Sequence, residues 1–132
     1  MNHKLLTLAI AATLSMAAQD MHKKLSSNVG FPFEANGVSM PAGKYEVARS
    51  ASQPILTIRD ARTRKSIMLI ATGTDGSKTG TSTLTFHRHG DRYFLSSVTD
   101  GSTGMVLTVP QSRRAKEVAS TSKPEIVVAA AR

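Results

Sequence analysis

Two histidines, His87 and His89, have the type and the spacing that could bind a metal ion. They lie two residues apart in a segment that we expect to be a strand, and side chains at that spacing on a strand project from the same face. A closed site needs a third or fourth ligand, and the chain has no cysteine, so the candidates are His22, Asp91 and Asp100. Because two ligands alone do not make such a site, we expect ordinary strand histidines, with no metal and no other cofactor.

Covalent catalysis has little support in the sequence. The chain has many serines but no Gly-x-Ser-x-Gly elbow, and no serine can be matched with a base and an orienting acid. In the segment 73–80, a lysine stands where a phosphate-binding loop needs its second glycine. Asp60, Asp91 and Asp100 fall in expected turns, where an aspartate commonly accepts hydrogen bonds from nearby backbone. We therefore interpret the chain as non-enzymatic, and the alternative is a small hydrolase or metal-dependent enzyme centred on the two histidines.

Basic residues form two clusters that could bind a polyanion. The clusters are Arg62, Arg64 and Lys65 in an expected connection, and Arg113, Arg114 and Lys116 on an expected helix. Neither cluster has aromatic side chains beside it for base stacking, so we expect no specific nucleic acid. Anionic surface polymers or lipid head groups are compatible partners. The alternative is that both clusters are only solvated surface that keeps a basic protein soluble.

The first 17 residues have the pattern of a cleaved secretory signal peptide. A short basic region ends at Lys4, and the apolar run Leu5–Met16 is shorter than the ~20 residues that span a bilayer. Small residues at Ser15 and Ala17 suit a cleavage site, so the mature chain is expected to begin near Ala18. We expect a secreted or periplasmic protein with no disulfide, and with no transmembrane segment once the leader is removed.

A β-hairpin over Thr83–Val98 is the best-specified element, and it must position both histidines. Apolar and polar residues alternate on either side of Gly90-Asp91, and glycine at the first turn position supplies the positive φ of a type II′ turn. A two-residue loop pairs Arg88 with Tyr93, Phe86 with Leu95 and Leu84 with Ser97, and it places His87 and Phe94 on the other face. A three-residue loop would instead pair Phe86 with Phe94.

The remaining elements follow from alternation and turn signals. Asn36-Gly37 predicts a second hairpin that pairs Ala35 with Val38 and Phe33 with Met40. Further strands are expected at 29–35, 38–40, 44–49, 54–59, 66–72 and 105–109, and a helix at 112–119 with Ser112 as its cap. The segment 66–72 is apolar at successive positions, which predicts a strand buried on both faces, and 73–82 is an expected loop. Residues 125–132 fit either an edge strand or a loose tail.

These elements predict an all-β protein. About seven short strands with a short C-terminal helix describe a small antiparallel barrel or a sandwich, and we favour the barrel because closure removes exposed edges. The expected organisation is a signal peptide at 1–17, a flexible lead-in at 18–28, one β-domain at 29–119 and a C-terminal tail at 120–132.

Three stretches resemble a known group of proteins. They are Phe31–Val47 with its Pro-Ala-Gly turn, Thr85–Leu95 with Gly-Asp-Arg-Tyr-Phe-Leu, and Ser112–Glu117. They look like small secreted, uncharacterised β-rich proteins that are numerous in soil acidobacteria. The resemblance implies export and a β-rich fold but no activity, and His89 stands where it leads us to expect tyrosine. Our interpretation is a secreted or periplasmic β-domain with a binding or structural role at the cell exterior.

Overall fold

The structure is a computed structural model that describes residues 24–50 and 52–132, so the expected signal peptide lies outside the described residues. Those residues form 11 strands and one short helix. The strands are β1 (Lys24–Val29), β2 (Phe33–Ala35), β3 (Val38–Met40), β4 (Gly43–Arg49), β5 (Ile55–Asp60), β6 (Ser66–Ile70), β7 (Thr72–Asp75), β8 (Ser82–His89), β9 (Arg92–Thr99), β10 (Met105–Thr108) and β11 (Glu125–Ala131), and the helix is α1 (Arg113–Thr121). Within these residues, no helix has the length and the apolar character needed to cross a bilayer.

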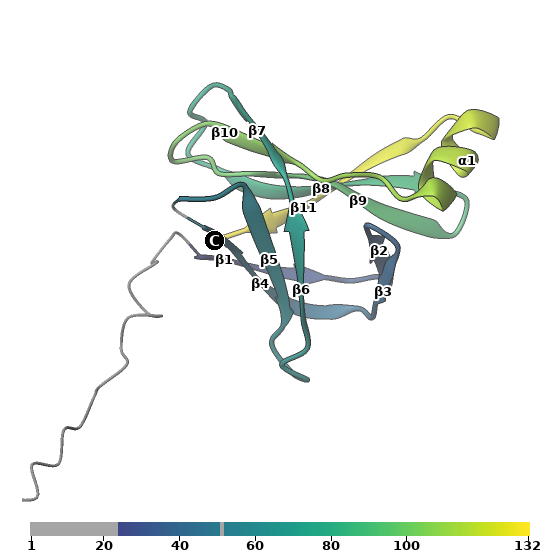
Figure 1. Cartoon of the computed structure of the whole chain (residues 1–132), viewed down its shortest axis with the longest axis horizontal. Helices are drawn as coiled ribbons and strands as arrows, with labels where there is room; N and C mark the ends of the chain where they lie inside the picture. The colour runs from purple at the N-terminus through teal and green to yellow at the C-terminus, as the bar shows by residue number, and fades with distance from the viewer. Residues whose placement is uncertain (1–23, 51) are drawn as a thin grey trace, which may run out of the picture.

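One mixed sheet contains all the strands and curls into a half-barrel (Figure 1). Its order is β3-β2-β9-β8-β11-β1-β4-β5-β6, and β10 lies between β9 and β7. The expectation of about seven antiparallel strands was wrong in two respects. There are 11 strands, and β2 runs parallel to β9 where Glu34 faces Phe94. The prediction of an all-β protein with one short helix is confirmed at this coarser level.

The two walls of the half-barrel enclose one hydrophobic core. Strands β1, β4, β5 and β6 form one wall, and β7, β8, β9 and β10 form the other (Figure 1). Alternation along each strand turns every second side chain inward. The largest fully buried side chains include Tyr45, Phe86, Met40, Leu56 and Ile58. The interior is therefore packed with side chains and does not form an open lumen.

The β8–β9 hairpin confirms most of the expected register. Gly90 has a φ of +62°, and Arg88 faces Tyr93 while Phe86 faces Leu95. Beyond that point the expected pairing of Leu84 with Ser97 was wrong, because a β-bulge leaves Ser96 without a partner across the ladder and brings Val98 opposite Leu84. The additional residue places apolar Val98 in the core and keeps Ser97 outside.

The Asn36-Gly37 hairpin confirms the prediction in both pairs. Asn36 and Gly37 have φ values of +46° and +84°, as a type I′ turn requires. Ala35 faces Val38, and Phe33 faces Met40. A local turn signal was therefore sufficient to set this register.

Both ends of the described chain correct the expected domain boundaries. Residues 24–28, expected in a flexible lead-in, belong to β1, where buried Ser27 donates its hydroxyl to the carbonyl of Ala130 at 2.7 Å. The expected tail contains β11, which is neither an edge strand nor loose. It pairs with β8 along its whole length and meets β1 at the pair Ser27 and Ala131. The missed strands have their hydrogen-bond partners far away in the sequence, which no local pattern reveals.

Two further expectations concern β6 and the segment that follows it. The prediction of a strand buried on both faces was wrong, because Met68 and Ile70 are 68% and 70% exposed. Ile67 and Leu69 face the core, and no layer covers the outer side of β6 in the described residues. The expected loop at 73–82 also begins too early, since Thr72–Asp75 pairs with β10 as β7.

Helix α1 begins where the sequence predicts. The side chain of Ser112 accepts a hydrogen bond from the backbone N–H of Ala115 at 3.1 Å, which is the contact of an N-cap serine. Ala115 is the buried residue of the helix, and like buried Phe94 it lies outside the main hydrophobic core cluster. The helix thus covers one outer face of the sheet near the hairpin turn (Figure 1).

Candidate functional site

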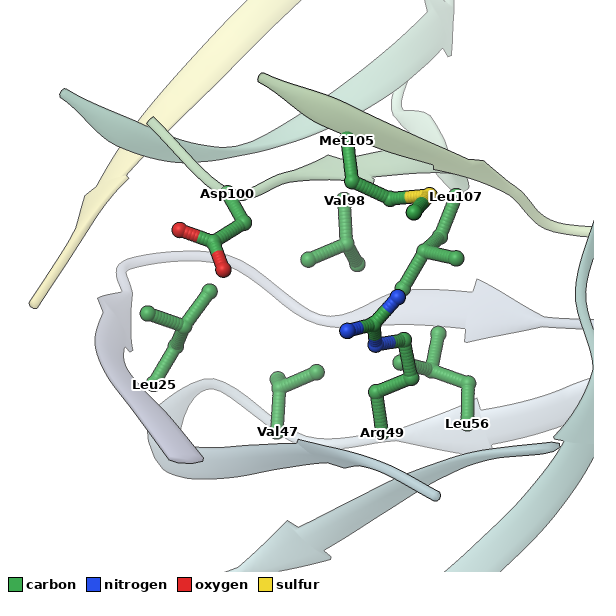
Figure 2. A pocket seen from close by; sticks show the side chains of 8 residues that line it. All are labelled: Leu25, Val47, Arg49, Leu56, Val98, Asp100, Met105 and Leu107. Carbon is green, nitrogen blue, oxygen red and sulfur yellow. The ribbon is translucent and has the colours of Figure 1, made fainter. Parts of the chain in front are cut away.

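A cavity of about 20 Å³ lies between the two walls of the half-barrel (Figure 2). Leu25, Val47 and Leu56 line it from one wall, and Val98, Met105 and Leu107 from the other. Figure 2 shows the guanidinium of Arg49 projecting between the walls, with the carboxylate of Asp100 across from it. Arg49 follows Tyr45 and Val47 in the inward alternation of β4, so the sequence contained a signal for its position that we missed.

The size of this cavity decides what it can do. A volume of about 20 Å³ holds about one water molecule, whereas pockets for small ligands usually measure roughly 300–1,000 Å³. Two wider hollows, of about 540 and 180 Å³, are open to solvent. The first lies beside Lys44 and Arg132, the second beside Glu34 and Arg92, and neither is lined by a histidine. In the hollow beside Lys44, the hydroxyl of Ser27 donates its hydrogen bond to the carbonyl of Ala130.

The structure separates the two histidines by environment. His87 faces Phe94 across the ladder and is half-buried, whereas His89 is only 7% exposed, beneath the C-terminal end of α1. The Asp100 carboxylate accepts a hydrogen bond from the backbone N–H of Ser102 at 3.0 Å. No group of three or more potential ligands that could hold a metal occurs in residues 24–50 and 52–132, and His22 lies outside them. The described residues therefore do not bring the candidate ligands together.

His89 does contact a hydroxyl group, because its Nδ1 lies 2.7 Å from Oγ of Ser122. A serine beside a histidine has the composition of a nucleophile and its base, but in the catalytic triad the serine faces Nε2 and an acid faces Nδ1. Here the serine occupies the Nδ1 side of a buried ring, at the C-cap of α1. The contact therefore ties the end of the helix to the hairpin.

A second group of interactions fixes the other end of the helix. Arg92 lies 3.0 Å from Glu34 and stacks its guanidinium over the ring of Phe94, 5.3 Å from the centroid. Arg114 of α1 lies 4.0 Å from the same Glu34 oxygen. One carboxylate thus links β2, β9 and α1 over the buried Phe94.

The two predicted basic clusters lie at different ends of the molecule (Figure 1). We call Arg62, Arg64 and Lys65, between β5 and β6, the turn cluster, and Arg113, Arg114 and Lys116 on α1 the helix cluster. In the helix cluster, Arg114 pairs with Glu34 and Arg113 lies 3.9 Å from Glu117. The turn cluster forms no salt bridge in the part of the chain that the structure describes. The two clusters therefore do not combine into one surface, and they differ in that the helix cluster forms salt bridges.

The turn that carries the turn cluster has a fixed backbone. The buried carboxylate of Asp60 accepts hydrogen bonds from the N–H groups of Arg62 at 2.9 Å and Thr63 at 3.4 Å, as expected of a turn aspartate. The Arg62 N–H bond is the main reason that the pKa of Asp60 is lowered, although burial opposes the shift. Arg64 adopts a φ of +66°, and the Asp60 N–H donates to the Lys65 carbonyl at 2.8 Å. Three cations are thus held on a rigid loop.

Tyr45 supports the same turn from inside the core. It faces Asp60 across the β4–β5 ladder, and its hydroxyl donates a hydrogen bond to the carbonyl of Pro41. Burial and, to a smaller extent, the negative charge of Asp60 raise the pKa of Tyr45 to about 12. The phenol is therefore neutral at physiological pH and acts as a structural donor.

The chain was also compared with known proteins. No protein-family model matches it, and neither does a curated protein or a solved structure. The resemblance to small secreted proteins of acidobacteria stays a prediction.

Proposed function

We propose that the protein is a secreted or periplasmic, non-enzymatic β-domain that binds an anionic partner at the cell exterior through the turn cluster. The observation that carries this proposal is the contrast between the two clusters. Arg62, Arg64 and Lys65 share one turn ordered by Asp60 and form no salt bridge among the described residues, whereas Arg113 and Arg114 form salt bridges with Glu117 and Glu34.

Electrostatics explains why such a turn favours an anion. Like charges on neighbouring residues repel one another, and a bound polyanion relieves that repulsion while it releases its counterions. The turn is already ordered by Asp60, so binding does not have to pay the entropy of fixing the loop. We regard the half-barrel as a barrel-type scaffold that presents this loop, and the leader pattern supports its export.

The experiment compares two variants with the same change in charge. Arg62→Glu with Lys65→Glu removes the turn cluster, and Arg113→Glu with Lys116→Glu is the matched control on α1. Arg64 is left unchanged because of its positive φ. All four positions are outside the core, so each substitution should change stability by no more than about 0.5 kcal/mol.

The measurement is binding to dextran sulfate as the salt concentration rises. Wild-type protein should bind at 0.1 M salt and be released towards 1 M, since the Debye length falls from ~10 to ~3 Å. The turn variant should be released at clearly lower salt than the helix variant. Equal shifts in both variants would show a response to net charge alone, and wild-type protein that ignores dextran sulfate at low salt would also contradict the proposal.

A further inference from the structure

Strand β6 is an open edge of the sheet formed by residues 24–50 and 52–132. It ends the strand order and, among those residues, pairs only with β5, with Leu69 opposite Leu56. At the two ends of this ladder Ala71 donates to the Pro54 carbonyl, and Asp60 donates to the Lys65 carbonyl. Bonded and non-bonded pairs alternate in an antiparallel ladder, so the N–H and C=O groups of Met68 and Ile70 point away from β5. The backbone of β6 therefore has a row of donors and acceptors on its open side.

The side chains of this edge are apolar and exposed. Met68 and Ile70 are 68% and 70% exposed, and partly buried Ile55 lies opposite Ile70 on the same outer face. Proteins usually protect an edge by making it short or by placing charged residues on it. The opposite edge follows that rule, since β3 has three residues and buries Met40. The outward side chains of β6 include no charged residue.

Charge lies at one end of the same edge. The turn cluster immediately precedes Ser66, so its cations stand at the N-terminal end of β6. A strand that pairs antiparallel with β6 would bring its own C-terminal end to this position. Complementary charge there means acidic residues or a free carboxylate.

From these three features we propose that β6 binds an extended segment of a partner protein, which adds as an antiparallel strand with apolar side chains followed by acidic residues at its C-terminal end. This proposal rests on the proposed function, because it uses the turn cluster as the anion-binding surface. Main-chain hydrogen bonds supply affinity in this mode of recognition, and alternate side chains supply specificity.

Two other occupants fit the edge less well. A lipid surface would cover Met68 and Ile70 but leave the outward N–H and C=O groups unsatisfied, which costs several kcal/mol per group in hydrocarbon. A second copy paired through β6 would face the turn cluster with residues 71–74, which carry no carboxylate. An acidic peptide strand satisfies the backbone, the apolar side chains and the cations together.

The test uses the full chain and a synthetic peptide in which valine and threonine alternate before a run of glutamates. One control peptide is N-methylated at the residues whose N–H groups would face β6, and a second carries the glutamates at its N-terminal end. The protein variants are Met68→Ser with Ile70→Ser on β6, and Ile126→Ser with Val128→Ser on β11. The β11 pair is the matched control, because both of its side chains are 57% exposed but lie on an interior strand.

The peptide should bind the wild type and the β11 variant equally, and the β6 variant and the turn variant at least tenfold more weakly. N-methylation should weaken binding to the same degree, and amide NMR shifts should centre on Met68 and Ile70. Equal binding of the N-methylated peptide would overturn strand addition. A wild type that binds dextran sulfate but not the peptide would refute this inference and leave the proposed function standing, and failure with both would refute both.

The remaining outcomes identify the rejected occupants. Binding to phosphatidylglycerol vesicles that requires Met68 and Ile70, without peptide binding, would assign the edge to a membrane. Residues 1–23 are the same in every variant, so any vesicle binding by them would not distinguish one variant from another. A dimer in sedimentation that disappears in the β6 variant would assign the edge to a second copy. Either result contradicts the proposal.

Discussion

The β8–β9 and β5–β6 hairpins both turn apolar side chains outward, but only one of them is covered. On β8–β9, Phe94 is only 3% exposed, and the contact of Ser122 with His89 holds the end of α1 to the same hairpin. On β5–β6, Met68 and Ile70 stay exposed, with no second layer over them in the described residues. The chain therefore contains its own example of a covered outer face, against which the bare one can be judged.

Charge follows the same division. Around Phe94, a single carboxylate at Glu34 forms salt bridges with an arginine from β9 and one from α1. Beside Met68, the three cations of the turn cluster form no salt bridge in the described part of the chain. The β8–β9 hairpin thus has a buried outward ring and salt bridges beside it, whereas β6 has exposed apolar side chains next to cations without a salt bridge in the described residues. This is the arrangement expected of a surface that is completed by a partner.

The largest effect should distinguish the two faces by stability. Phe94→Ala should lower the free energy of unfolding by about 3–5 kcal/mol, since it leaves a cavity where a buried ring was. Met68→Ala should change it by no more than about 0.5 kcal/mol, because its side chain is already in water. Urea unfolding measures both, and similar costs would show that the two faces are not different in kind.

A smaller effect should come from the contact that holds the end of the helix. Ser122→Ala should cost about 1–3 kcal/mol, because it leaves Nδ1 of buried His89 without its partner. The control is Ser120→Ala, whose hydroxyl bonds the exposed carbonyl of Glu117 within the helix. If both substitutions lower the free energy of unfolding equally, then the His89 contact does not hold the end of α1 to the hairpin.

The smallest effect concerns Tyr45, which supports the β5–β6 turn from inside the core and should change stability only at alkaline pH. The pKa of Tyr45 is raised from 10.0 to about 12, so its folded state favours the neutral phenol. That contribution is fully present below pH 10 and is lost as the pH rises through about 12. The free energy of unfolding should therefore fall over this range, and Tyr45→Phe should reduce the fall. An identical alkaline dependence in wild type and Tyr45→Phe would contradict this account.

The sequence correctly predicted the features that depend on neighbouring residues. Asn36-Gly37, Gly90 and the Ser112 cap act within a few residues, and each prediction was confirmed. The bulge at Ser96 was missed because only packing against Leu84 selects Val98 over Ser97 as the inward residue. The face of β6 was missed for a related reason, since its run of apolar residues has no alternation to mark the outside.

The candidate site also has features that the sequence predicts and features that depend on the folded structure. Both basic clusters are visible in the sequence, and so is the aspartate that orders the turn. Their difference is not visible, because Arg114 meets Glu34 only after β2, β9 and α1 have come together. The metal hypothesis depended on spacing along a strand, and the helix that buries His89 comes from a later part of the chain.

The position of β11 has a consequence for how the protein folds. It follows all the other described elements in the chain, yet it lies between β8 and β1, and the bond from Ser27 to Ala130 joins residues 103 positions apart. Ser26 and Arg132 add two reciprocal backbone bonds to the same junction. Such long-range pairing is slow to form, because loop closure must precede any gain in contacts. A nascent chain therefore cannot complete this sheet until β11 has been made.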